Sequence, residues 1–255
     1  MTLWDSVILG VVEGVTEFLP ISSTGHLILT STLLGIPDSA FISSFEIAIQ
    51  LGAILAVPVL FFKSFLDIEI LKRLVVAFIP TAIIGLLAYS FVKTYLLGNE
   101  LVVVIALAVG GALLIIFELL HKENDSAPDL RTMPYLHAAL IGCFQALAII
   151  PGVSRSAATI VGGLLLGVQR VAIVEFSFLL AVPTMLAATG LDLLKTSASF
   201  TGNEILMLAI GFVISFIVAL ASIKWLLAFV RTNTFIPFGI YRLAAALLFF
   251  LFVLA

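Results

Sequence analysis

Hydrophobic residues in this chain come in long unbroken runs rather than in short alternating stretches. Six of these runs, of about 18 to 21 residues each, are long enough to cross a hydrocarbon layer of ~30 Å. They predict transmembrane helices at residues 45–62, 74–92, 101–120, 171–191, 205–223 and 236–255. The apolar-out, polar-in alternation of a membrane barrel is absent from the sequence, so helices must satisfy the backbone in lipid. We therefore expect an all-α integral membrane protein.

Four further apolar segments are too short to cross a membrane alone. They form two pairs, and a short polar string interrupts each pair. Their positions are residues 7–19 and 27–35, then residues 136–150 and 157–167. A short helix, a polar break and a second short helix predict a re-entrant hairpin. Such a break is tolerated at membrane depth only where protein buries it or where it lines a wet cavity.

The two hairpins match each other under a gap-free shift of 132 residues, which carries Glu13 onto Gln145 and Ser22 onto Ser154. Three long runs follow each hairpin. Because three crossings are an odd number, the second repeat must be inverted relative to the first, with a site at the midplane. The expected parts of this single membrane domain, 1–255, are a first repeat, a cytoplasmic linker and a second repeat: residues 1–120, 121–134 and 135–255.

Lysine and arginine are divided unevenly between the two ends of the predicted bundle. Only Lys93 and Lys195 fall on the N-terminal face. The opposite face carries Lys63, Lys72, Arg73, Lys122, Arg131, Arg170, Lys224 and Arg231. Under the positive-inside rule, both termini lie outside the cytoplasm. The first hairpin would then enter from the outer face and the second from the cytoplasmic face.

Composition agrees with this architecture. The chain is 62% hydrophobic and 11% charged, and its mean hydropathy of +1.30 is too high for a soluble fold. The formal net charge of −3 argues against a nucleic-acid partner. We therefore expect the bilayer to be the main surrounding of the protein.

Two carboxylates open the first polar string. Glu13 and Glu17 are four residues apart, so on a helix they share one face. Such a pair in a poorly solvated place shares a proton or holds a cation, and carboxylate and phosphate oxygens suit Mg²⁺ or Ca²⁺. Glu13 and Glu17 are thus candidate metal ligands. The alternative is a solvated charged face on an amphipathic helix.

Hydroxyls and a histidine follow Pro20, which breaks that helix. Ser22, Ser23 and Thr24 could contact a phosphate or could cap the next helix. His26 is able to move a proton near neutral pH, with a hydroxyl three residues away as partner and nucleophile. The alternative for His26 is a structural hydrogen bond to a carbonyl.

The second polar string contains Ser154, Arg155 and Ser156 after Pro151 and Gly152. An arginine at this depth needs an anionic partner, which could be a glutamate of the other hairpin or a phosphate held by its two-pronged guanidinium. A purely structural ion pair is the alternative. Acids, hydroxyls, a proton carrier and an arginine together suit phosphoryl transfer or hydrolysis.

These strings carry a resemblance to a known family. The motifs are Glu-Gly-Val-Thr-Glu-Phe-Leu-Pro-Ile-Ser-Ser-Thr-Gly-His at 13–26 and Pro-Gly-Val-Ser-Arg-Ser at 151–156. They resemble the undecaprenyl-diphosphate phosphatase family, also called the bacitracin-resistance family. Similarity extends through the chain, including Phe235-Ile-Pro-Phe238 and Tyr241-Arg242. Members commonly have glycine after the second motif, where this chain has Ala157.

The resemblance implies a bacterial inner-membrane enzyme that hydrolyses undecaprenyl diphosphate to undecaprenyl phosphate. This activity recycles the lipid carrier of peptidoglycan synthesis and confers bacitracin resistance, and the active site would open on the periplasmic or extracellular side. The implied catalytic residues are Glu17, Ser23, His26 and Arg155, and the implied substrate-binding residues are Ser22, Thr24, Ser154 and Ser156. Glu13 and Glu17 would hold Mg²⁺ or Ca²⁺.

Parts of this pattern also occur in two other classes of membrane protein. The acid-phosphatase-like lipid phosphatases also use a Ser-Gly-His string, but the histidine that they place four residues after the arginine is Thr159 here. A transporter or flippase for a prenyl phosphate lipid is the alternative from another class, because inverted repeats are typical of transporters. Arg242 is expected to pair with an acidic side chain. The sequence leaves open whether two copies form a homodimer.

Overall fold

The computed structural model describes residues 1–37, 39–96, 99–122, 128–195 and 200–254, and it gives residues 93, 191–195 and 253–254 by their backbone alone. Within these residues every regular element is a helix, which confirms the all-α prediction. The long elements are α1 (Leu3–Thr16), α2 (Ser23–Leu33), α3 (Ala40–Leu60), α5 (Ile68–Tyr95), α6 (Glu100–Leu120), α7 (Tyr135–Ala146), α8 (Arg155–Leu165), α9 (Arg170–Lys195), α10 (Gly202–Phe229) and α11 (Ile236–Phe249). A short α4 (Phe62–Phe65), a 3₁₀ turn (Leu147–Ile149) and a π turn (Phe250–Leu254) complete them. Part of the expected linker, 123–127, and the side chains of Lys93 and Lys195 lie outside this description.

Five helices are long and apolar enough to cross a membrane: α3, α5, α6, α9 and α10. Each coincides with one of the predicted runs. The sixth predicted run forms α11, which is shorter because it passes into the π turn at Phe250. The chain is thus a multi-pass helical membrane protein.

The two predicted hairpins are α1–α2 and α7–α8. Thr2 and Asp5 form a capping box that starts α1, and Ser154 caps α8 by accepting a hydrogen bond from Ala157 N–H. The shift of 132 residues carries the bounds of α2, 23 and 33, onto those of α8, 155 and 165. Gly35 and Gly167 follow the two helices with φ of 64° and 76°, a left-handed conformation that favours glycine.

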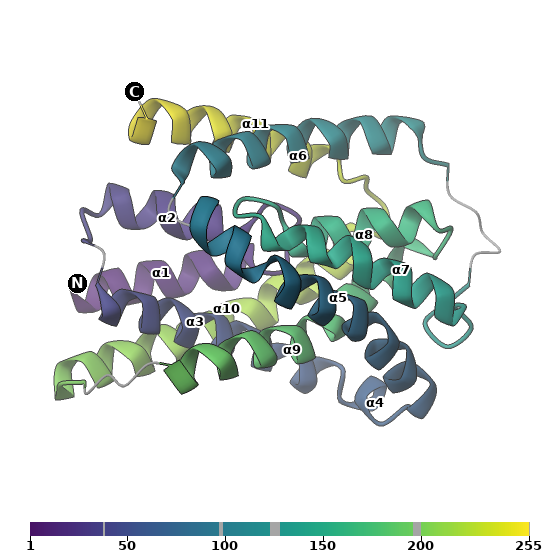
Figure 1. The fold of residues 1–255 in the computed structure, drawn as a ribbon, viewed down its shortest axis with the longest axis horizontal. Coiled ribbons are helices and arrows are strands. Elements are labelled where there is room, and N and C mark those ends of the chain that lie inside the picture. Colours follow the sequence, from purple (N-terminus) through teal and green to yellow (C-terminus); the bar gives the residue numbers. More distant parts are fainter. Residues whose placement is uncertain (38, 97–98, 123–127, 196–199, 255) are drawn as a thin grey trace.

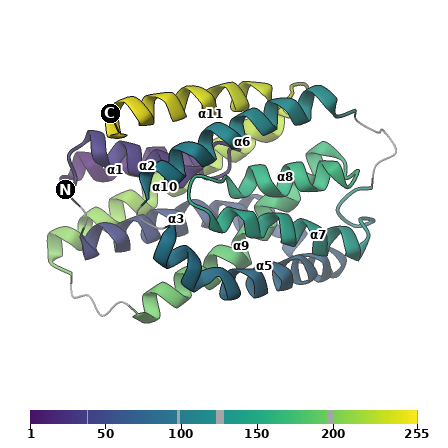
Figure 2. The same ribbon diagram turned by 45° about the horizontal axis from the view of Figure 1, so that its top comes forward.

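Each hairpin packs against a helix from the other half of the chain. α1 lies along α10, and α7 lies along α5. Gly10 and Gly142, which the shift superimposes, allow close approach, since a methyl group on either would collide with a backbone carbonyl of the facing helix. Figure 1 shows the hairpins entering from opposite ends of the bundle, with both termini at the α1–α2 end and the α6–α7 connection at the other. The turned view in Figure 2 agrees.

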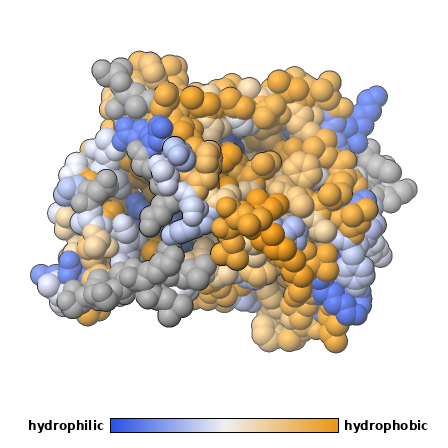
Figure 3. All heavy atoms as spheres, in the orientation of Figure 1, coloured by the Kyte–Doolittle hydropathy of each residue, from blue (hydrophilic) through white to orange (hydrophobic). Residues whose placement is uncertain are grey.

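The outer surface is apolar across its middle. In Figure 3 orange hydrophobic side chains cover the centre of the face, whereas blue hydrophilic ones gather toward the two ends. Large apolar side chains such as Leu87, Leu113 and Ile217 point outward from the long helices. In water this much exposed apolar surface would be unfavourable, so the surface indicates lipid around the middle of the bundle.

Candidate functional site

The breaks of the two hairpins meet inside the bundle. Ser156 donates a hydrogen bond to the carbonyl of Leu19 (2.8 Å), and Ser154 lies 3.1 Å from Ser156 Oγ. Both serines are buried. Their hydroxyls therefore join the second break to the first, and Ser154 caps α8 as well.

Three of the predicted site residues form one hydrogen-bonded group across this junction. Arg155 Nη2 donates to Glu17 Oε1 at 2.9 Å, and Ser23 Oγ donates to Glu17 Oε2 at 2.7 Å. Glu17 thus holds the cation with one carboxylate oxygen and the hydroxyl with the other. A nucleophile paired with a base, and a base oriented by a third group, is the arrangement that activates hydroxyl nucleophiles.

The other side of the Arg155 guanidinium is also fixed. Nη1 donates to the carbonyl of Ser177 on α9 at 2.8 Å, and the Ser177 hydroxyl lies 2.6 Å from Thr159 Oγ1. Arg155 also lies over the Phe18 ring, 5.8 Å from its centre. These contacts pre-orient the guanidinium, which reduces the reorganisation needed when an anion binds.

Glu13 lies deeper than Glu17. Its side chain is 0% exposed, and neither carboxylate oxygen has a hydrogen-bond partner among the described residues. The carboxylates of Glu17 and Glu46 repel a negative charge on Glu13, and the charge of Arg155 attracts it. A buried ionised carboxylate without a partner is strongly unfavourable, so a proton or a cation must neutralise it.

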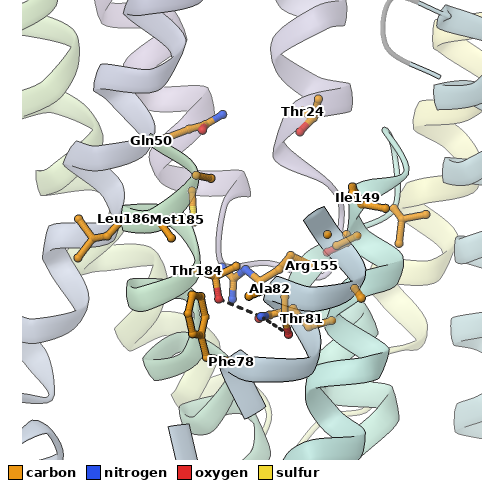
Figure 4. Close-up of a pocket in the computed structure, with 18 of the residues that line it drawn as sticks. Thr24, Gln50, Phe78, Thr81, Ala82, Ile149, Arg155, Thr184, Met185 and Leu186 are labelled. Atoms are coloured by element: carbon orange, nitrogen blue, oxygen red, sulfur yellow. Dashed lines mark hydrogen bonds between the residues drawn. The ribbon is translucent and has the colours of Figure 1, made fainter. Parts of the chain in front are cut away.

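A cavity of about 1250 Å³ opens beside the junction. Glu17, Ser22, Ser23, Thr24 and Arg155 line one part of it. The remaining wall is mostly apolar and comes mainly from α5, α9, and the end of α7 with the 3₁₀ turn after it, including Phe78, Leu86, Met185, Leu186 and Ile149. Figure 4 shows Arg155 in the cavity near Thr184, with Thr24 and Gln50 approaching from other helices. The cavity thus combines a polar end with walls suited to a hydrocarbon chain.

The structure shows a second polar cluster in this cavity that the sequence did not predict. Gln145 Nε2 donates to Thr184 Oγ1 at 2.9 Å and to Thr81 Oγ1 at 3.2 Å, the bonds dashed in Figure 4. The repeat matches Gln145 to Glu13. This match was the feature of the sequence that could have indicated a role for Gln145 in the site. The threonines gave none, because isolated threonines in apolar helices are common.

The other predicted residues divide between two places. Ser22 and Thr24 line the cavity, and Ser22 is the N-cap of α2 without a side-chain capping bond. His26 instead points to α11: its Nδ1 lies 2.7 Å from the Ser22 carbonyl and its Nε2 lies 2.8 Å from Tyr241 Oη. The hydroxyl expected to pair with His26, that of Ser23, is bonded to Glu17.

The expectation for Arg242 was wrong. Its buried guanidinium is bonded to four backbone carbonyls instead of an acidic side chain, and two of them, those of Pro20 and Gly152, lie in the breaks, where carbonyls lack helical partners. Gln50 of α3 borders the cavity.

Fold and site together define a multi-pass helical membrane protein with a buried acid, arginine and hydroxyl constellation beside an apolar cavity. The sequence matches the family model described as "Bacitracin resistance protein BacA" over residues 6–248. The chain belongs to this family, as the sequence motifs predicted.

Named relatives resemble the chain over its full length. An undecaprenyl-diphosphatase of Aquifex aeolicus is 52% identical over 255 residues, covering 100% of both chains. One from a Sulfurihydrogenibium species is 53% identical, covering 98% of this chain and 99% of the relative. One from Thermus thermophilus is 46% identical, covering 100% of this chain and 98% of the relative.

Proposed function

We propose that this protein is an undecaprenyl-diphosphate phosphatase, which releases the terminal phosphate of undecaprenyl diphosphate and leaves undecaprenyl phosphate. Relatives that are 52% and 53% identical to this chain over their full length carry the name undecaprenyl-diphosphatase. The observation that carries the proposal is the group of Ser23, Glu17 and Arg155, which joins the two breaks at a cavity. The reaction recycles the lipid carrier for peptidoglycan synthesis, and bacitracin resistance follows from faster recycling.

The cavity accommodates both parts of such a substrate. The diphosphate occupies the polar end, where Arg155 offers a guanidinium and Ser22, Ser23 and Thr24 offer hydroxyls. The prenyl chain lies along the apolar walls of α5 and α9. It excludes water from that end of the site. Ser154 and Ser156 contribute by holding the breaks together, and Ser154 also lines the cavity.

Glu17 is placed to take a proton from the nucleophile. Ser23 Oγ, or a water in its place, attacks the terminal phosphorus while its proton passes to Glu17. The bond between the terminal phosphorus and the bridging oxygen breaks, and undecaprenyl phosphate leaves. When Ser23 attacks, water then hydrolyses the phosphoserine. Arg155 stabilises the negative charge on the phosphoryl oxygens throughout.

Glu13 and Glu17 are the proposed ligands of Mg²⁺ or Ca²⁺. The two unpartnered oxygens of Glu13 support this, since a cation would satisfy them. Among the described residues no third histidine, cysteine, aspartate or glutamate completes a cluster, so substrate oxygens and water would fill the remaining positions. The ion would neutralise charge on the diphosphate.

The membrane arrangement is an inverted repeat with six spans and two re-entrant hairpins. The coincidence of α2 and α8 under the 132-residue shift supports the division into 1–120 and 135–255. The entry of the hairpins from opposite ends in Figure 1 supports the inversion. We place the protein in the bacterial cell membrane, with both termini and the opening of the site on the outer side.

Purified protein should release inorganic phosphate from undecaprenyl diphosphate when Mg²⁺ or Ca²⁺ is present. A chelator should abolish the release, and added metal should restore it, because Glu13 and the diphosphate both need a counter-charge. A malachite green assay measures the product. Protein that binds the lipid with metal present but releases no phosphate would refute the enzyme and favour a transporter or flippase.

Orientation makes a separate prediction. In vesicles whose protein is inserted with its termini outside, substrate added outside should be hydrolysed without permeabilisation, since the first hairpin enters from that face. Inside-out vesicles prepared from the same cells are the control. Equal activity in sealed vesicles of both orientations, or activity in the inside-out ones alone, would contradict the proposed topology.

A further inference from the structure

Arg242 is a buried cation whose partners within the described structure are backbone carbonyls. The residue is only 1% exposed. Nη2 donates to Ala106 O at 3.0 Å and to Gly152 O at 3.2 Å. Nε and Nη1 donate to Leu107 O and Pro20 O, each at 3.4 Å. Burying an arginine is unfavourable unless its N–H groups are hydrogen-bonded. Here the four carbonyls accept these hydrogen bonds.

Two of these carbonyls belong to the two breaks. Pro20 lies in the first break and Gly152 in the second, whereas Ala106 and Leu107 belong to α6. One rigid guanidinium plane therefore joins both breaks to each other and to a spanning helix. Gly110 on α6 provides the space, because a methyl group there would collide with Arg242 Nη2.

Tyr241, the preceding residue on α11, holds the first break by a second route. Its hydroxyl lies 2.8 Å from His26 Nε2, and the two rings are nearly parallel, at 7°. The Ser22 carbonyl can only accept a hydrogen bond, so His26 Nδ1 carries the hydrogen. In the neutral ring Nε2 then accepts from the tyrosine. The chain of bonds runs from Tyr241 through His26 to Ser22.

Ser22 needs such support. Among the described residues it is the only non-glycine with positive φ, at 74°. A side chain in this conformation is strained, and surrounding contacts must maintain it. Ser23, which donates to Glu17, comes directly after it. A change in the backbone conformation of Ser22 would thus move the Ser23 hydroxyl away from the Glu17 carboxylate.

We propose that the adjacent residues Tyr241 and Arg242 are positioning residues that hold the two breaks in register: Arg242 through the carbonyls of Pro20 and Gly152, and Tyr241 through His26 and the Ser22 carbonyl. Neither residue lines the cavity. They therefore act on the reaction through Ser23, Glu17 and Arg155. This inference rests on the proposed phosphatase function.

The test compares Tyr241→Phe and Arg242→Lys with wild-type protein in phosphate release. Lysine keeps the charge but loses the planar fork that spans several carbonyls. We expect kcat to fall about tenfold for Tyr241→Phe and about a hundredfold for Arg242→Lys, with KM changed less than about threefold, because small misplacements of reacting groups slow chemistry strongly. Tyr95→Phe and Arg73→Lys are matched controls, since Arg73 is also buried and donates to the carbonyls of Met133 and Glu69, outside both breaks.

Two further variants keep the test decisive. Gly110→Ala displaces the Arg242 guanidinium without removing a polar group, and alanine favours a helix more than glycine does, so its kcat should fall without loss of helix stability. In a double-mutant cycle Tyr241→Phe should add little to His26→Ala, since both break one chain of bonds. Wild-type kcat in Tyr241→Phe and Arg242→Lys, a change in KM alone, equal losses in Arg73→Lys, or full additivity in the cycle would overturn the inference.

A spectrum separates failure of this inference from failure of the proposed function. In ¹⁵N NMR of histidine-labelled protein, assigned with His26→Ala, the His26 signals should show a protonated Nδ1 and a hydrogen-bonded Nε2. Tyr241→Phe should shift the Nε2 signal, and Tyr95→Phe should not. An unchanged Nε2 signal in Tyr241→Phe overturns the inference whether or not the wild-type protein releases phosphate, whereas a wild type with the expected spectrum and no phosphate release refutes the phosphatase function alone.

Discussion

Arg155→Ala should lower kcat/KM for phosphate release by a factor of about 10² to 10³, the loss typical when one preorganised donor to a developing charge is removed. Arg155 is the cation that the second hairpin brings to Glu17, 2.9 Å away, and it lines the cavity. Without it, the charge on the phosphoryl oxygens is not stabilised, and Glu17 loses its partner. Steady-state phosphate release by the purified variant measures the effect.

Arg155→Lys and Arg131→Ala complete this experiment. Lysine restores charge but not the two-pronged contact, so its activity should lie between those of alanine and arginine. Arg131 pairs with Asp67 through an exposed guanidinium and does not line the cavity, so its loss should leave activity intact. Activity near that of the wild type in Arg155→Ala would remove Arg155 from the mechanism.

Glu17→Gln should lower kcat by a factor of about 10² to 10⁴, the usual contribution of a general base. The amide has nearly the same shape, so the packing of the break is preserved, but it cannot accept the proton of Ser23 or balance the charge of Arg155. Because loss of the buried pair with Arg155 also lowers the stability, a large fall in kcat in protein that is still folded at the assay temperature would identify a chemical role. Phosphate release and thermal unfolding are measured on the same preparation.

Glu175→Gln is the matched control for that substitution. Glu175 lies on α9, accepts a hydrogen bond from Ser64 at 2.9 Å, and does not line the cavity beside the two breaks. Its loss should leave kcat unchanged. If Glu17→Gln retained most of the wild-type kcat, water or Ser23 would have to lose its proton to another group, and the proposed role of Glu17 would be wrong.

Much of the fold could be predicted from hydropathy because a bilayer fixes the length of a spanning helix. The runs at 45–62 and 101–120 correspond to α3 and α6 within a few residues. Pro20 and Pro151 marked the breaks because each lies in a short polar string; proline alone was not sufficient, since Pro58, Pro80 and Pro183 lie inside α3, α5 and α9. The shortness of α11 could not be predicted, because the apolar run continues through the π turn at Phe250.

The candidate site could be predicted in part. Arg155 was expected to meet a glutamate of the first hairpin or a phosphate, because an isolated charge in an apolar bundle needs a partner, and the structure joins it to Glu17. The Ser23 hydroxyl was expected to pair with His26, whereas it donates to Glu17. The partners of Arg242 could not be predicted, since backbone carbonyls have no signature in the sequence. The contact between His26 and Tyr241 depends on how α2 and α11 rotate about their axes, which hydropathy does not determine.

A structure of the protein bound to a prenyl methylenediphosphonate, whose P–C–P bridge resists hydrolysis, would locate the substrate relative to the two breaks. We predict that the terminal phosphonate lies within hydrogen-bond distance of both Arg155 and Ser23, next to Glu17, with the prenyl chain between α5 and α9. A diphosphonate bound outside this cavity, or inside it without contact to Arg155 and Ser23, would contradict the proposal that the two breaks form one phosphatase site.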